Sequence, residues 1–252
     1  MNQTTMYNIT LRQSDAMKRI YDFLPINVKS QRVFANNNNI HKIVEDEIDR
    51  LGNDADLNHI ITKQVTNMDG LFEGLDFCGD ISMWNTSKVT SMEAMFKNCK
   101  DFNCDLSRWN ISCVKSMDGM FYGCEKFNMP LYSWEPFSLR FATKMFYKCK
   151  AFDQDMSRFI AENLTDMSYM FYGCENFKGI GLDVWDVQNV VDFRRMFVGC
   201  KKLVCDLSKW EFPDKAKKFP YFNGSFYNCN LPKSKMPKCF DKETLNKMLD
   251  DI

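Results

Sequence analysis

The sequence is poor in histidine, with only two, and this removes most zinc sites and most catalysis that pairs histidine with serine or cysteine. Cationic and anionic side chains number 33 each, so the formal net charge is zero. Nucleic-acid and anionic-membrane partners draw on an excess of lysine and arginine, and neither is expected. No window approaches the roughly 18 apolar residues of a membrane-spanning helix. The start of the chain shows no signal peptide and no lipidation signal, which predicts a cytoplasmic or virion location.

Motifs that carry chemistry are also missing. No Gly-rich phosphate loop, nucleophile elbow or paired-carboxylate spacing occurs, so we predict no catalytic residue, no cofactor and no enzyme activity. The eleven cysteines include no C-x-x-C pair, and the C-x4-C pairs Cys99/Cys104 and Cys200/Cys205 have no histidine beside them. We therefore favour buried, apolar thiols over a metal site. Disulfides between neighbouring repeats stay open on distance, although the absence of an export signal favours a reducing compartment.

The chain does contain a repeat of about 25 residues, centred on a Met-Phe-x-x-Cys pattern. The phenylalanine of this pattern, the anchor, recurs 24 to 29 residues apart at Phe72, Phe96, Phe121, Phe146, Phe171, Phe197 and Phe226. A second aromatic series keeps nearly the same period at Trp84, Trp109, Trp134, Phe159, Trp185 and Trp210. Because two independent series share one period, chance is a poor explanation.

Other positions follow the anchor, and the fullest copy is VTSMEAMFKNCKDFNCDLSRWN, residues 89–110. Apolar spacing predicts a short helix over residues 89–99. Glycine or asparagine stands two residues after most anchors, Lys148 being the exception, and predicts a left-handed turn there. Alternation predicts a short strand over residues 105–109. One such unit buries too little apolar surface to fold alone, so the units are expected to stack in register.

Non-repeating segments flank the array. We predict an N-terminal helical cap over residues 1–57, a repeat solenoid over 58–240 and a C-terminal capping helix over 241–252, with Asp241 as its N-cap. Within the first cap, helices are expected from Ser14 to Leu24 and from Ile40 to Leu51, the second closed by Gly52.

Units such as MWNTSKVTSMEAMFKNCKDFNCDLSRWN and NLTDMSYMFYGCENF resemble the BspA-like leucine-rich repeats of the mycoplasma-lipoprotein type. The resemblance covers about residues 40–240. It implies an α/β repeat fold, a leucine-rich-repeat-like solenoid of about seven coils with short parallel strands, short helices and helical caps at both ends. It brings no catalytic residues. Members of that family are often surface adhesins, and cytosolic and large-virus versions also occur.

The repeat is not uniform, and its departures predict bending or irregularity in the middle and at the end of the stack. Leu139 and Ala142 replace the usual valine and methionine of the fourth unit. Two residues are inserted in KGIGLDVW, and the last unit, KKFPYFNGSFYNC, is longer than the others.

Two exposed series are candidates for recognition. The first follows the anchors and contains Tyr122, Tyr147, Tyr172 and Tyr227; the second lies on the outward side of the predicted strands and contains Arg108, Arg158 and Lys209. For both, plain packing or solvation is the competing interpretation. A partial series, Asp80, Asp105, Asp155 and Asp206, could suggest calcium but is expected to bond local backbone amides instead.

These features predict a non-enzymatic protein–protein interaction scaffold with a protein partner, free or within a larger assembly. The alternatives are a structural coat or cement subunit of a virus or cell envelope, and an exported surface adhesin. The Asn-, Lys-, Phe- and Met-rich composition suits an AT-rich genome of bacterial or large-virus type.

Overall fold

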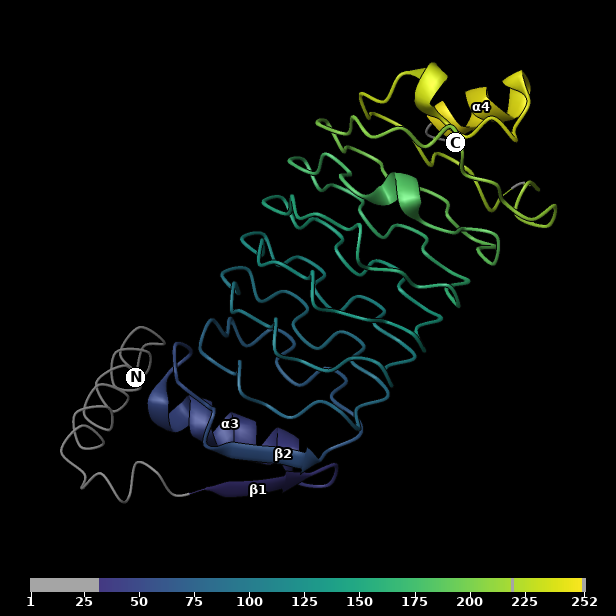
Figure 1. The fold of residues 1–252 in the computed structure, drawn as a ribbon. Helices are drawn as coiled ribbons and strands as arrows, with labels where there is room; N and C mark the ends of the chain where they lie inside the picture. Colours follow the sequence, from purple (N-terminus) through teal and green to yellow (C-terminus); the bar gives the residue numbers. More distant parts are fainter. Residues whose placement is uncertain (1–31, 219, 251–252) are drawn as a thin grey trace, which may run out of the picture.

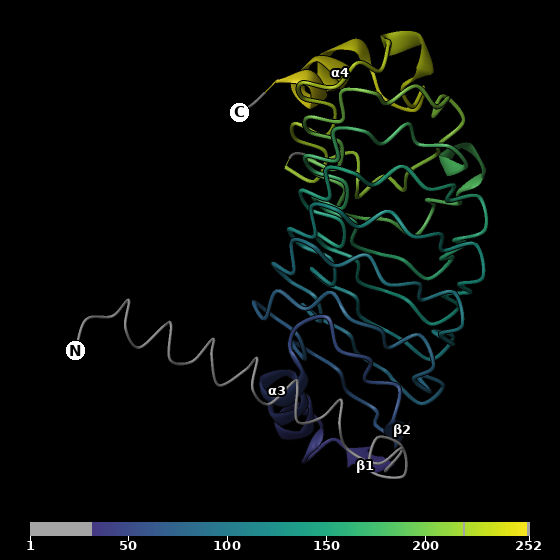
Figure 2. The ribbon, with the colours of Figure 1, turned by 90° about the vertical axis from the view of Figure 1, so that its left-hand side faces the viewer.

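A computed structural model describes residues 32–218 and 220–250, in which the chain winds upward in successive coils between α3 and α4 (Figure 1). A view turned by 90° shows the same coils stacked face to face (Figure 2). The helix predicted from Ser14 to Leu24 lies outside the described residues. The described segments contain two α-helices, two strands and two short 3-10 helices, and turns make up most of the coils.

The first end of the stack is a strand–helix–strand unit. Strand β1 (Val33–Asn36) pairs in parallel with β2 (Ile60–Gln64), and α3 (Ile40–Leu51) connects them. Helix α3 has the bounds predicted from the sequence, including the stop at Gly52, whose φ is +93°. The two strands were not predicted, because four or five residues carry too little periodicity to distinguish a strand from a loop.

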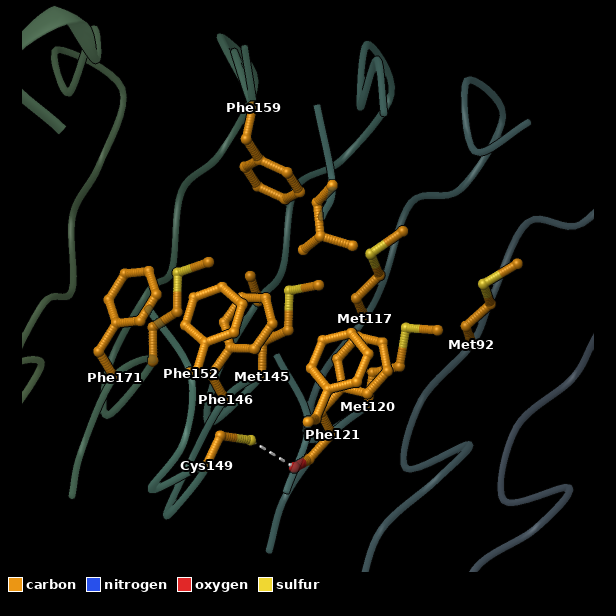
Figure 3. Close-up of a cluster of buried hydrophobic side chains, with 14 of the residues drawn as sticks. Met92, Met117, Met120, Phe121, Met145, Phe146, Cys149, Phe152, Phe159 and Phe171 are labelled. Atoms are coloured by element: carbon orange, nitrogen blue, oxygen red, sulfur yellow. Dashed lines mark hydrogen bonds between the residues drawn. The ribbon is translucent and has the colours of Figure 1, made fainter. Parts of the chain in front are cut away.

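The anchors form one continuous aromatic column. All seven are buried, and successive rings lie parallel with centroids 5.4–5.9 Å apart, from Phe72–Phe96 to Phe197–Phe226. Within a coil, each anchor from the first to the fifth also stacks on a second phenylalanine, as Phe96 does on Phe102 at 3.9 Å. Figure 3 shows Phe121, Phe146 and Phe171 in this column, with methionines beside them. Each coil thus buries its large side chains against the coils before and after it.

Hydrogen bonds between coils follow the same register. The amide of each anchor donates to the next coil, as Phe96 N does to Met120 O at 2.9 Å and Phe121 N to Met145 O at 2.9 Å. Amides two residues before the anchors donate in the same direction, as Ala94 N does to Asp118 O at 2.8 Å. Isolated parallel bridges, from Asn67–Ser91 to Asp166–Asp192, lie in the same segments. We call these hydrogen-bonded stretches ladder segments.

The short helix predicted over residues 89–99 is wrong, since this stretch is a run of turns. Its φ angles are +52° at Ala94 and +65° at Asn98, values that no right-handed helix contains. Alternate amides also bond to the next coil, so they cannot form helical i→i−4 bonds. This turn geometry also buries apolar residues that lie at helical spacing. The spacing alone therefore does not distinguish such a run of turns from a helix. The left-handed position two residues after each anchor is confirmed in every unit, Lys148 included at +59°.

The strand predicted over residues 105–109 is also wrong. Leu106 to Trp109 form a tight turn, in which Trp109 N donates to Leu106 O at 3.0 Å. The indole of Trp109 donates in addition to Ile81 O of the preceding coil at 3.2 Å. Trp84, Trp134, Trp185 and Trp210 make the equivalent bond. The alternation in this stretch therefore reflects a turn with buried ends, and the indole bonds hold adjacent turns together.

Irregularity is confined to the insertion and the last unit. Leu139 and Ala142 are fully buried, and the bridges Ser116–Phe141 and Phe141–Asp166 keep the register through the fourth unit. The stretch that contains the insertion includes the 3-10 helix η1 (Leu182–Val184). Gly181 precedes η1 at φ +84°, and a β-carbon there would lie 2.2 Å from Ser157 N.

The last unit is closed by the second helix. After η2 (Lys233–Lys235), α4 (Lys242–Leu249) begins at Asp241, whose carboxylate accepts a hydrogen bond from Thr244 N at 2.7 Å. The end of α4 takes the place of a further ladder segment, because Phe226 N donates to Met248 O at 2.8 Å and Gly224 N to Lys247 O at 3.3 Å. Met248 is fully buried. The helix predicted over 241–252 is thus formed over Lys242–Leu249.

Candidate functional site

One side of the stack is built from the ladder segments and presents a continuous surface, which we call the ladder face. In each segment, side chains at fixed sequence offsets from the anchor are buried in the stack, and the side chains between them face solvent. The first to sixth segments contributing to this face are residues 66–74, 90–98, 115–123, 140–148, 165–173 and 191–199. Because these segments repeat in register, side chains at one position form a row along the stack.

Three of the four predicted tyrosines come together on this face. The rings of Tyr122 and Tyr147 are 4.5 Å apart and nearly parallel, and those of Tyr147 and Tyr172 are 4.6 Å apart. All three residues are half-buried, and the ring faces that form the stack cover one another. Tyr169, two residues before its anchor, extends the group, with its ring centroid 6.1 Å from that of Tyr172.

Tyr227 lies apart from this group. Val198 occupies the equivalent position in the intervening segment and is only 5% exposed. The row of tyrosines is therefore interrupted by a small, buried side chain. The aromatic cluster of the ladder face consists of Tyr122, Tyr147, Tyr169 and Tyr172.

The second predicted series is placed differently from expectation. Arg108, Arg158 and Lys209 are exposed, but they lie in tight turns and not on the outward side of a sheet. Arg108 Nη1 contacts Met83 Sδ of the preceding coil at 2.7 Å and lines an open hollow beside Asp80. These residues form an edge of the stack that is separate from the aromatic cluster.

Several ladder-face residues adopt a backbone conformation that suits glycine. Gly70, Gly119 and Gly224 stand two residues before their anchors with φ near +60°, whereas Lys144, Tyr169 and Arg195 occupy the same position at +56°, +57° and +53°. Lys148, two residues after its anchor, is at +59°. A left-handed conformation costs a residue with a β-carbon about 1–2 kcal/mol. These four side chains, all in the fourth to sixth segments, are therefore kept at a cost, as are Ala94 and Asn98 of the second segment at +52° and +65°.

The same three segments carry an excess of positive charge. They contain the five cations Arg140, Lys144, Lys148, Arg194 and Arg195 but only the two anions Asp166 and Asp192. The first three segments show the reverse, with the four anions Asp69, Glu73, Glu93 and Asp118 against the two cations Lys97 and Lys115. Although the whole chain is neutral, the ladder face changes from acidic to basic along the stack.

The lysines of the basic half contact the aromatic cluster. Lys144 Nζ lies 5.5 Å from the ring centroid of Tyr169, and Lys148 Nζ lies 5.5 Å from that of Tyr147. Such cation–π contacts hold the ammonium groups beside the rings while leaving them open to solvent. Arg194 pairs with Asp192 of its own segment at 2.8 Å.

Asp118 is the most perturbed carboxyl of the ladder face. Burial raises its pKa to about 6, and the nearby charges of Glu93 and Asp166 add to the rise. Thr143 N donates to its Oδ1 at 2.7 Å, which opposes the shift. Burial likewise raises the pKa of Asp192. These carboxyls lie close to further acids, and no base–nucleophile pair accompanies Asp118 in the contacts described.

The repeated cysteines are structural thiols. Cys99, Cys124, Cys149, Cys174 and Cys200 are buried and free. Each thiol donates to the backbone oxygen of the preceding anchor, as Cys149 Sγ does to Phe121 O at 2.9 Å (Figure 3). Burial raises the pKa of Cys99 to about 11 and that of Cys149 well above its usual range. A thiol that resists ionisation is a poor nucleophile and metal ligand.

The aspartate series bonds local amides, as expected from the sequence. Asp105 Oδ1 accepts from Ser107 N at 2.8 Å, and Asp80, Asp155 and Asp206 make the same bond to the serine two residues later. Within residues 32–218 and 220–250, no group of three histidine, cysteine or acidic side chains could hold a metal ion. Nor does this part of the chain include a helix long and apolar enough to cross a bilayer.

The ladders of phenylalanine, tryptophan and cysteine define a protein made of in-register repeats. The chain belongs to the family described as Mycoplasma protein of unknown function, DUF285, whose model matches residues 31–159 and 138–238. No curated protein and no solved structure matches the chain.

Proposed function

We propose that this protein is a non-enzymatic protein–protein interaction scaffold, built on a leucine-rich-repeat-like solenoid of the BspA-like kind. The observation that carries the proposal is the aromatic cluster, in which Tyr122, Tyr147 and Tyr172 stack in register and stay half-exposed. Tyrosine is enriched at protein interfaces because it combines a large apolar ring with a polar tip and loses few rotamers on binding.

Other features support binding over catalysis. The repeated thiols are buried with raised pKa values, and the repeated aspartates are engaged in their own turns. Helix α4 bonds to the last ladder segment, which favours a discrete molecule over a filament of chains stacked end to end. The coat-subunit and adhesin alternatives have no comparable observation in their favour.

The test compares two tyrosine variants in capture of partner proteins from a lysate of the source organism. We expect Tyr147→Ala combined with Tyr172→Ala to abolish capture of a specific partner. Tyr132→Ala is the matched control, because Tyr132 is 57% exposed but lies in a turn away from the ladder face. Equal capture by all variants would remove the aromatic cluster as the binding surface.

The turn edge is tested in the same experiment with Arg158→Ala. Because Arg158 and the aromatic cluster lie on separate surfaces, the two variants report on different sites. Loss of capture with Arg158→Ala alone would move the binding surface to the turns and contradict the proposal.

A further inference from the structure

The fourth to sixth ladder segments combine three features that occur together nowhere else on the described ladder face. These are three of the four tyrosines of the aromatic cluster, an excess of three positive charges, and the left-handed residues Lys144, Lys148, Tyr169 and Arg195. We call this region, residues 140–148, 165–173 and 191–199 of the ladder face, the basic patch.

The strained residues indicate that the patch is kept for something other than folding. Glycine fits both positions and is present there in other segments, as at Gly70 and Gly74. A lysine or tyrosine held in a left-handed conformation where glycine would be less strained points to a role for the side chain itself. All four strained side chains of the patch are basic or aromatic, the residue types that dominate recognition surfaces.

We propose that the basic patch binds an extended acidic protein segment, which places its carboxylates beside Arg140, Lys144 and Lys148 of the fourth ladder segment. This inference rests on the proposed function and names the chemistry of the partner. Charge complementarity is the argument for an acidic occupant, because cations exceed anions five to two across these segments. The ammonium groups of Lys144 and Lys148 lie 5.5 Å from the ring centroids of Tyr169 and Tyr147, so one peptide segment can contact a cation and an aromatic ring together.

A peptide fits this surface better than a nucleic acid does. Tyr122 and Tyr172 cover both faces of Tyr147, and each of them has one face covered in turn, which leaves little ring surface for the base stacking on which single-stranded nucleic-acid recognition depends. Asp166 lies within the patch and Asp118 beside it, and both would repel a continuous row of phosphates. Carboxylates spaced along a peptide can avoid them.

The experiment selects a displayed library of random 12-residue peptides against the full chain. We expect the recovered peptides to be enriched in aspartate and glutamate. Their affinity for the Lys144→Gly/Lys148→Gly variant should fall at least tenfold, whereas it should be unchanged for Ala94→Gly/Asn98→Gly. This control removes the same left-handed strain, at φ +52° and +65°, from a segment outside the patch.

Melting temperature supplies the second readout. Glycine relieves the left-handed strain in both variants, so Tm should rise by a few degrees in each while only the lysine variant loses peptide binding. A lower Tm in the lysine variant alone would mean that the two lysines are kept for stability, and would overturn the proposal.

The outcomes separate the two hypotheses. Peptides that need Tyr147 and Tyr172 but are neutral or basic, or bind the lysine variant unchanged, would overturn the acidic partner and leave the scaffold standing. Recovery of no peptide that depends on either pair would overturn both. Binding of a 20-nucleotide oligouridylate that depends on the two lysines, without acidic peptides, would assign the patch to nucleic acid instead.

Discussion

Single residues in this protein matter according to their position relative to the anchor. The ring centroid of Phe121 lies 5.6 Å from those of the anchors in both neighbouring coils and 4.0 Å from that of Phe127 in the same coil. Tyr122, the next residue, stacks only on Tyr147 and is half-exposed. Adjacent side chains therefore have different roles: Phe121 holds neighbouring coils together, and Tyr122 contributes to the surface.

We predict that Phe121→Ala lowers the free energy of unfolding by about 3–5 kcal/mol, because it removes a ring and leaves a cavity bordered by two coils. Tyr122→Ala is the control and should cost about 1 kcal/mol or less. Urea denaturation followed by tryptophan fluorescence measures both. A loss under about 1 kcal/mol for Phe121→Ala would contradict a shared core.

Asp118 predicts a dependence of stability on pH. Its folded pKa of about 6 lies above the ordinary value of 3.8, so its favourable contribution exists below about pH 4 and is lost as pH rises to about 6. Asp118→Asn keeps an oxygen for Thr143 N and removes the charge. At pH 7 the variant should be more stable by about 1 kcal/mol, a value discounted for partial exposure, and near pH 4 the difference should vanish. Chemical denaturation at both pH values tests this, and a stability gap unchanged between them would refute it.

Thiol reactivity should follow burial. The raised pKa values of Cys124, Cys149 and Cys174 predict that a thiol-alkylating reagent leaves them unmodified in the native protein at pH 7.5. The exposed Cys78 and Cys113 should be labelled first. Mass spectrometry of peptides after timed labelling reads out each site, and fast labelling of Cys149 would contradict its structural role.

At the scale of elements, the caps depend on ordinary helix signals. Helix α4 has an aspartate N-cap and one fully buried side chain, Met248, and its last turn accepts hydrogen bonds from Gly224 and Phe226. The ladder segments differ, since their hydrogen bonds go to neighbouring coils. The end helix is thus specified locally, whereas each ladder segment is specified by its neighbours.

We predict that Asp241→Ala destabilises α4 by about 1 kcal/mol, because the amide of Thr244 loses its acceptor. Hydrogen exchange should speed up first in residues 242–249 and then in the last ladder segment, whose amides bond to α4. Asp241→Asn keeps a capping oxygen and is the control. Faster exchange confined to the first coils would be incompatible with this role of α4.

At the scale of the whole molecule, stability is shared between adjacent coils. The aromatic column, the indole bonds and the thiol bonds each join one coil to the next. An array of this kind tolerates the loss of a whole unit better than the loss of register, because removing one unit restores equivalent contacts between the remaining ones.

Deleting residues 122–146 removes one 25-residue unit and joins Phe121 to Tyr147 in register. We expect this variant to remain folded with a moderately lower Tm. A deletion that is three residues shorter than one unit places every later residue out of register with the preceding coil. The coils after the deletion should then unfold. Circular dichroism during heating compares the two, and equal damage from both would contradict the array.

Much of this organisation was readable from the sequence, for particular reasons. The anchor and tryptophan series could be aligned because a stack that repeats in space must repeat in sequence. Helix α3 was predicted to the residue because its apolar stripe and Gly52 stop are local signals. The conformation of the coils was misassigned, because the turns of residues 89–99 place apolar side chains at helical spacing while their amides bond elsewhere.

The candidate surface was foreseen in part. Tyr122, Tyr147 and Tyr172 were selected because their common offset from the anchor implies one row, and Tyr227 was selected on the same ground although Val198 separates it. Tyr169 and Lys144 were missed. Their signal, a non-glycine residue where other units have glycine, has meaning only once φ is known at that position.

The sequence by itself determined the period, the identity of each inward-facing row and the helices at the ends, because periodicity and capping are written in neighbouring residues. Only the tertiary structure decided which backbone amides bond between coils, which residues carry left-handed strain, and how charge is distributed along the ladder face. These properties arise when one coil packs against the next, and the local sequence of a single coil does not specify which atoms meet at that contact.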